Sequence, residues 1–133
     1  MAIRCVYTDL DGTLLGRGGA LVKDADGEFT LLPVRALEAC ARAQAEVVPM
    51  SGRRKPTVAE IARLFGQRSF IYEVGCAMVV DGEETLLTGN VKPRDGKTVF
   101  ELIAESGAPR LLLDTYRGRL EYHAPWHGGR EFS

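Results

Sequence analysis

Two aspartates stand two residues apart, directly after a short apolar run. Asp9 and Asp11 follow residues 2–8, and Gly12 comes next. Where a buried strand opens into a turn, alternate residues can point the same way, and a glycine permits a tight backbone path. Both carboxylates can therefore face one site, where such groups transfer protons or bind a hard cation. The alternative is a pair of aspartates that only shape a turn or cap a helix.

A serine follows a second apolar run in the same way. Ser51 comes directly after residues 46–50 and is followed by Gly52 and Arg53. If the two strands are neighbours, the Ser51 hydroxyl and the Gly52 amide would lie beside Asp9 and could donate hydrogen bonds to a ligand there. A serine that only forms a turn is the alternative. Arg53 also has two interpretations, because it could approach an anionic substrate or be solvated at a polar turn.

The segments around these residues alternate between strand and helix patterns. We expect strands at residues 2–8, 46–50 and 70–74, one helix that begins near Pro33, and a second from Pro56 to Gly66. This order is typical of a doubly wound α/β sheet, in which parallel strands end at a common edge and ligands bind there.

The pattern changes after the third expected strand. Residues 77–80 and 85–88 flank Asp81 and Gly82, a pair that favours a tight hairpin turn. Beyond residue 91 we expect a helix at 98–105 and strands at 110–114 and 119–123, which would begin another α+β unit.

The first motif resembles that of the haloacid dehalogenase-like (HAD) hydrolase superfamily, Asp-x-Asp-x-Thr at the end of the first strand, with Asp9, Asp11 and Thr13 matching. Ser51 resembles the second motif. The resemblance implies that Asp9 attacks phosphorus to form an aspartyl-phosphate and that Asp11 is the general acid and base. It also implies Mg²⁺ held by Asp9 and Asp11. The substrate-binding residues it implies are Leu10, Gly12, Thr13, Ser51, Gly52 and Arg53.

Two further segments resemble the type IIB branch, which includes Cof-type sugar phosphatases, trehalose-phosphate phosphatase and mannosyl-3-phosphoglycerate phosphatase. They are Ser51-Gly52-Arg53 and residues 73–76, which read Glu-Val-Gly-Cys where the branch commonly has Glu-Asn-Gly-Ala. The resemblance implies a partial HAD-like, Rossmann-like three-layer sandwich over residues 1–90, with helices on both faces of a parallel sheet. Residues 91–133 would begin an α+β cap, and the substrate would be a small phosphomonoester, a sugar phosphate.

Two later parts of the family pattern have no counterpart in these 133 residues. The family uses a lysine near the nucleophile, but Lys55, Lys92 and Lys97 fall in the turn before the second helix or in the expected cap. The family also uses late aspartates, usually after Gly-Asp, and no Gly-Asp pair occurs. We therefore expect a truncated phosphatase. The alternatives are a non-catalytic phosphate- or partner-binding chain, completed by self-association or by a missing C-terminal half, and a phosphomutase.

Composition excludes several other classes of function. The 17 basic and 18 acidic residues are nearly balanced and scattered, so we expect no nucleic-acid partner. The apolar runs are too short to cross a membrane, and we expect a cytoplasmic protein. The partner that the family resemblance implies is a small-molecule phosphorylated substrate. Three cysteines without a Cys-x-x-Cys pair predict buried free thiols and no zinc site.

Overall fold

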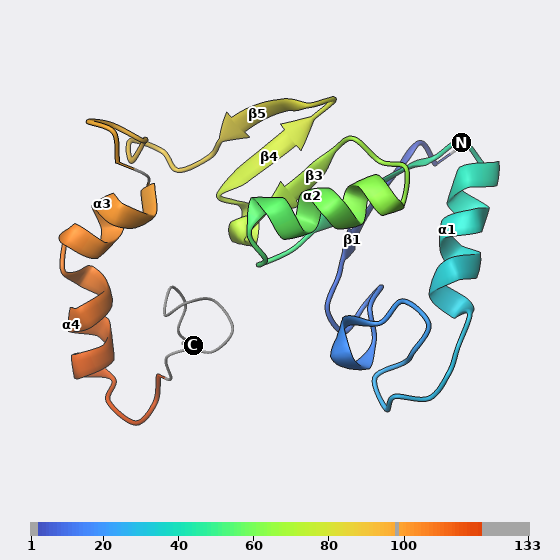
Figure 1. The fold of residues 1–133 in the computed structure, drawn as a ribbon, viewed down its shortest axis with the longest axis horizontal. Helices are drawn as coiled ribbons and strands as arrows, with labels where there is room; N and C mark the ends of the chain where they lie inside the picture. The colour runs from blue at the N-terminus through green and yellow to red at the C-terminus, as the bar shows by residue number, and fades with distance from the viewer. Residues whose placement is uncertain (1–2, 98, 121–133) are drawn as a thin grey trace. The chain divides into compact units, whose positions relative to one another are not determined.

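A computed structural model describes residues 3–97 and 99–120 (Figure 1). The chain divides into two compact units, Met1–Thr88 and Gly89–Ser133. No helix in the described ranges is long and apolar enough to cross a membrane.

The first unit is built on a mixed five-stranded sheet with the strand order β1-β2-β3-β4-β5. The first three strands, β1 (Cys5–Asp9), β2 (Glu46–Met50) and β3 (Phe70–Tyr72), pair in parallel. The last two, β4 (Ala77–Val80) and β5 (Glu83–Leu86), form an antiparallel hairpin that extends the sheet. The α/β fold and the parallel strands expected from the sequence are confirmed.

Two helices connect the parallel strands. α1 (Leu32–Arg42) contacts β2, and α2 (Lys55–Leu64) contacts β2 and β3. Both have a proline in the first turn, where its fixed φ suits a helix and its missing N–H leaves no internal bond unmade. Figure 1 shows α2 lying against the sheet. Its buried face carries Val58 and Ala62 into the core.

The hairpin turn has the conformation that its sequence predicts. Asp81 and Gly82 both have positive φ, 52° and 92°, as a two-residue turn between twisted strands requires. Because the turn uses only these two residues, Glu83 pairs directly with Val80. β5 therefore begins two residues earlier than the expected range of 85–88.

β3 is shorter than predicted. It ends at Tyr72, and a single 3-10 turn, η2 (Glu73–Gly75), follows. Glu73 and Val74 have φ of 49° and 56°, a left-handed conformation that cannot continue a strand.

The second unit contains α3 (Val99–Glu105) and α4 (Ala108–Thr115). The helix expected at 98–105 is confirmed for Val99–Glu105, but the strand expected at 110–114 is wrong, because these residues lie in α4. Gly107, with a φ of 73°, separates α3 from α4, and Pro109 lies in the first turn of α4. The strand expected at 119–123 lies mostly outside the described residues.

The three cysteines are free, as expected, but they are not buried. Cys76 is exposed, and Cys5 and Cys40 are partly exposed. The reason lies in their positions, since none of them belongs to the cluster of buried side chains between α2 and the sheet.

Candidate functional site

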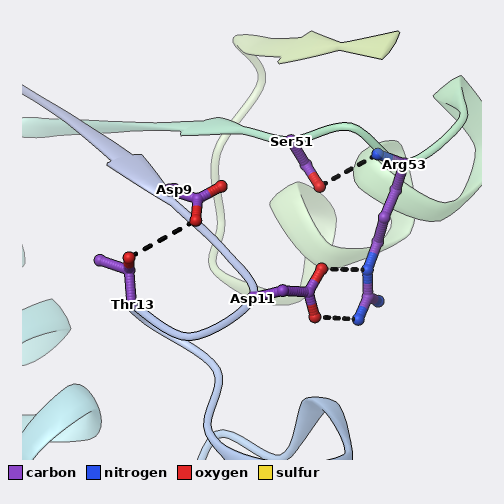
Figure 2. A network of polar contacts seen from close by, with 5 residues as sticks. All are labelled: Asp9, Asp11, Thr13, Ser51 and Arg53. Atoms are coloured by element: carbon purple, nitrogen blue, oxygen red, sulfur yellow. Dashed lines mark hydrogen bonds and ion pairs between the residues drawn. The ribbon is translucent and has the colours of Figure 1, made fainter. Parts of the chain in front are cut away.

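The ends of β1 and β2 bring the two predicted motifs together. In the parallel pairing of these strands, Asp9 lies opposite Met50, the last residue of β2, and Ser51 follows directly after it. Met50 in turn pairs with Ile71 of β3. The carboxyl ends of the three parallel strands therefore meet at one edge, and Figure 2 shows Asp9, Asp11 and Ser51 around the same space there.

Leu10 explains why the two aspartates are two residues apart. Its side chain has no exposed surface and belongs to the core cluster with Leu14 and Leu15. Asp9 and Asp11, on either side of it, are exposed. The burial of Leu10 thus anchors the loop and turns both carboxylates out of the core. Leu10 was predicted to bind substrate. Because its side chain is buried, it could do so only through its backbone.

The loop after Asp9 is closed by its own backbone. The Gly12 amide donates to the Leu15 carbonyl at 2.8 Å, and the Thr13 amide donates to the Leu10 carbonyl at 3.3 Å. Gly12 has a φ of 82°, which a residue with a Cβ adopts only at a cost. Because these two amides already have acceptors, the Thr13 hydroxyl is the group of this pair that faces the site. It donates to Asp9 Oδ2 at 3.5 Å.

Ser51 is held between two loops. Its side chain is buried, and its Oγ accepts a hydrogen bond from the Arg53 amide at 3.1 Å. The Ser51 carbonyl accepts from the Val74 amide at 3.2 Å, and the Arg53 carbonyl accepts from the Glu73 amide at 3.1 Å. The turn after β3 therefore supports the Ser51–Arg53 loop. The sequence reasoning missed this role of residues 73 and 74.

Arg53 and Asp11 form a two-pronged ion pair across 42 positions of sequence. Arg53 Nε donates to Asp11 Oδ2 at 2.7 Å, and Arg53 Nη2 donates to Oδ1 at 2.5 Å. Figure 2 shows the Asp11 carboxylate turned toward the guanidinium, while the Asp9 carboxylate lies on the other side of the space. No pattern in the sequence connected these two residues.

Lys55, the first lysine after Ser51, is engaged elsewhere. Its Nζ lies 2.8 Å from Glu84 Oε1, and the same carboxylate accepts a hydrogen bond from the Tyr72 hydroxyl. The bonds from Lys55 and Tyr72 lower the pKa of Glu84, whereas burial and the neighbouring Glu84 raise the pKa of Tyr72. This cluster joins α2, β3 and β5. In the described part of the chain, therefore, Lys55 stabilises the hairpin rather than the nucleophile.

The residues present fit part of a magnesium site. The Asp9 carboxylate and the Asp11 carbonyl are hard oxygen ligands, and Mg²⁺ prefers such ligands and keeps several waters. Asp9 is exposed, so its carboxylate is accessible from solvent. However, no group of three His, Cys, Asp or Glu side chains within residues 3–97 and 99–120 could hold a metal ion.

Comparison with known proteins supports the fold. No protein-family model matches the chain, and no curated protein matches it. Among solved structures, the chain matches a phosphatase of the haloalkanoate (HAD) enzyme superfamily from Bacteroides thetaiotaomicron with a TM-score of 0.52 and 18% identity. The match covers 84% of this chain and 36% of that one.

Two further structures match similarly. A Thermoplasma acidophilum protein has a TM-score of 0.53 and 18% identity, over 79% of this chain and 43% of that one. A hypothetical protein from Geobacillus kaustophilus HTA426 matches with a TM-score of 0.51 and 20% identity. This match covers 90% of the present chain and 40% of the Geobacillus chain. The chain thus has part of an HAD-like α/β fold and spans 36% to 43% of the length of these structures.

Proposed function

We propose that this chain belongs to a Mg²⁺-dependent phosphatase that hydrolyses a small phosphomonoester, a sugar phosphate, through an aspartyl-phosphate at Asp9. The observation that carries the proposal is the register of β1 against β2. It places Ser51 one residue beyond the strand partner of Asp9, at the edge of a parallel sheet where ligands bind. The likeness in fold to an HAD superfamily phosphatase supports the same reaction class.

The first step joins Asp9 to the phosphoryl group. A carboxylate oxygen of Asp9 attacks phosphorus in line, and the bond to the leaving oxygen breaks. Asp11 gives its proton to that oxygen, so the alcohol leaves neutral. Asp11 then takes a proton from a water that attacks the same phosphorus, and the bond to Asp9 breaks to release phosphate. Mg²⁺, when bound at Asp9 and the Asp11 carbonyl, offsets the charge of the phosphoryl oxygens.

Three neighbouring groups orient the reactants. The Thr13 hydroxyl bonds Asp9 Oδ2 and leaves Oδ1 for the attack. Ser51 Oγ accepts its bond from the Arg53 amide, so its own hydrogen can be donated to a phosphoryl oxygen. The Gly52 amide, next in the loop, offers a second donor.

The remaining parts of the site come from outside these 133 residues in this proposal. They are a cation beside the nucleophile and further acidic ligands for the metal, which either a longer product or a second copy of the chain would supply. The engagement of Lys55 by Glu84 favours one other function, a chain that binds phosphate or a partner without turning substrate over. A phosphomutase would share the chemistry of Asp9 but return the phosphoryl group to the sugar.

Activity on an aryl phosphate with Mg²⁺ tests the proposal. The 133-residue chain and the longest natural product that contains it would be assayed beside their Asp9→Asn variants. Asp26→Asn is the matched control, because Asp26 is an exposed aspartate in a loop remote from Ser51 in sequence. We expect turnover in the complete product that Asp9→Asn abolishes and Asp26→Asn preserves. Absence of turnover in both lengths would favour the binding function, and label retained in sugar phosphate would indicate a mutase.

A further inference from the structure

We propose that Arg53 is a positioning residue, which fixes the carboxylate of Asp11 so that it can deliver a proton to the leaving group. This inference rests on the proposed phosphatase function. It differs from the interpretation of Arg53 as a residue that contacts the substrate, because the Nε and Nη2 atoms of its guanidinium both donate hydrogen bonds to Asp11.

The geometry of the pair sets the orientation of the carboxylate. Two parallel bonds, from Nε at 2.7 Å and from Nη2 at 2.5 Å, hold both oxygens of Asp11. A two-pronged pair of this kind fixes the plane of a carboxylate, which a single bond does not. The Arg53 side chain is 29% exposed and that of Asp11 is 51% exposed, so the arginine side chain as a whole is the better packed partner. Arg53 therefore holds Asp11, and not the reverse.

Arg53 is itself anchored at its backbone and confined at its tip. Its amide donates to Ser51 Oγ, and its carbonyl accepts from the Glu73 amide. At the other end, a Cβ added to Gly19 would lie 3.1 Å from Arg53 Nη2. The absence of a side chain at Gly19 thus leaves space for the guanidinium. Arg53 therefore connects the Ser51 loop with the Asp11 loop, and its guanidinium lies beside the turn at Gly19.

Asp11 needs such a partner because its own loop restrains it little. It is half exposed and precedes Gly12, and within residues 3–97 and 99–120 both hydrogen bonds to its carboxylate come from Arg53. A free aspartate would populate several rotamers, and an acid that is displaced by about 1 Å can lose a large part of its catalytic effect. The fork selects one of these orientations before substrate arrives.

Substrates with different leaving groups separate positioning from substrate binding. p-Nitrophenolate leaves without a proton, whereas the alkoxide of glycerol 2-phosphate needs one. In the active product, we expect Arg53→Gln to lower kcat on glycerol 2-phosphate at least about tenfold more than on p-nitrophenyl phosphate, with little change in KM. Arg53→Lys should restore part of the loss. Equal losses on both substrates, a raised KM, or unchanged or faster turnover would overturn the proposal.

Arg63→Gln is the matched control. Arg63 forms the same kind of fork with Glu60, at 2.9 and 2.8 Å, near the C-terminal end of α2. Its loss should leave both substrates unaffected, so an effect of Arg53→Gln cannot be ascribed to the loss of any surface ion pair.

A second measurement tests the pair even if no turnover is found. In ¹H–¹⁵N spectra of the 133-residue chain, a fork slows exchange of the arginine Nε–H with water. We expect one protected Nε–H signal to disappear in both Arg53→Gln and Asp11→Asn, and another to disappear in Glu60→Gln. Persistence of the Arg53 signal in Asp11→Asn would overturn the positioning role, whereas failure of phosphatase activity alone would overturn the proposed function, and with it the delivery of a proton, but not the fixed pair of Arg53 and Asp11.

Discussion

The hydroxyl of Thr13 donates a hydrogen bond to Asp9 Oδ2, four residues before it, at 3.5 Å. This contact is formed within one loop. The loop is closed by a hydrogen bond from the Leu15 amide to the Leu10 carbonyl, and both leucine side chains are buried. One oxygen of the proposed nucleophile is thereby occupied, and the other faces the edge shared with Ser51.

Thr13→Val should therefore weaken catalysis without unfolding the protein. Valine keeps the shape of threonine but cannot donate, so the Asp9 carboxylate loses its orientation. At 3.5 Å the bond is a weak one to a charged group, and we expect a loss of about three- to tenfold in kcat/KM on an aryl phosphate. Thr13→Ser is the control that keeps the hydroxyl. Equal activity of the valine variant and the wild type would show that the contact does not orient Asp9.

Leu10→Ala should destabilise the first unit. The side chain has no exposed surface, and its removal leaves a cavity beneath the loop that carries both aspartates. We expect the free energy of unfolding to fall by about 2–5 kcal/mol, measured by urea denaturation. Leu64→Ala is the matched control, since Leu64 is 67% exposed at the end of α2 and should change stability by no more than about 0.5 kcal/mol. Similar losses in the two variants would contradict the anchoring role of Leu10.

Val74→Asn should make the protein more stable. Val74 is 87% exposed and has a φ of 56°, a conformation that costs a β-branched residue about 1–3 kcal/mol and that asparagine tolerates better. We expect a gain of about 1 kcal/mol in urea denaturation. Val80→Asn is the control, because Val80 is 51% exposed in the extended strand β4, where asparagine is disfavoured. If both variants lose stability, Val74 is not strained.

The position of Val74 also shows where sequence reasoning ends. A β-branched residue shortly after Ile71 and Tyr72 favours a longer strand, but the bonds from the Glu73 and Val74 amides to the Arg53 and Ser51 carbonyls accompany a turn of the backbone there. The strand predicted at 110–114 failed for a related reason. A run of three leucines fits a buried strand as well as a helix, and the local signal for a helix is Pro109 in its first turn.

The motif residues were more predictable because local rules place them. Asp9 and Ser51 each end an apolar run, and parallel pairing of such runs brings their ends together. The partner of Asp11 was not predictable in this way. Arg53 lies 42 residues away, and the length and rotamer of its side chain decide whether it reaches the carboxylate or the solvent.

Stability should depend on pH through Glu84. Its bonds from Lys55 and Tyr72 place its folded pKa below the ordinary value of 4.5. A lowered pKa contributes stability that is present above pH 4.5 and is lost as the pH falls through the folded value. Glu84→Gln removes this contribution. We expect urea denaturation to show the wild type more stable than the variant at pH 7, and the difference to shrink by about pH 3.

The size of this difference should be modest. The side chains of Lys55 and Glu84 are 47% and 38% exposed, so water screens the pair, and about 1 kcal/mol or less is expected at pH 7. Glu83→Gln is the control, because Glu83 is its exposed neighbour on β5. A difference between wild type and Glu84→Gln that is the same at both pH values would show that the cluster does not titrate with Glu84.

Magnesium should bind the 133-residue chain weakly and through Asp9. Two oxygen ligands, the Asp9 carboxylate and the Asp11 carbonyl, leave most of an octahedral shell to water, so we expect a dissociation constant of about a millimolar or weaker. Titration with MgCl₂ should shift the amide signals of residues 9–13, and Asp9→Asn should abolish the shifts while Asp26→Asn leaves them intact. Tight binding, or shifts that survive Asp9→Asn, would show that other residues hold the metal.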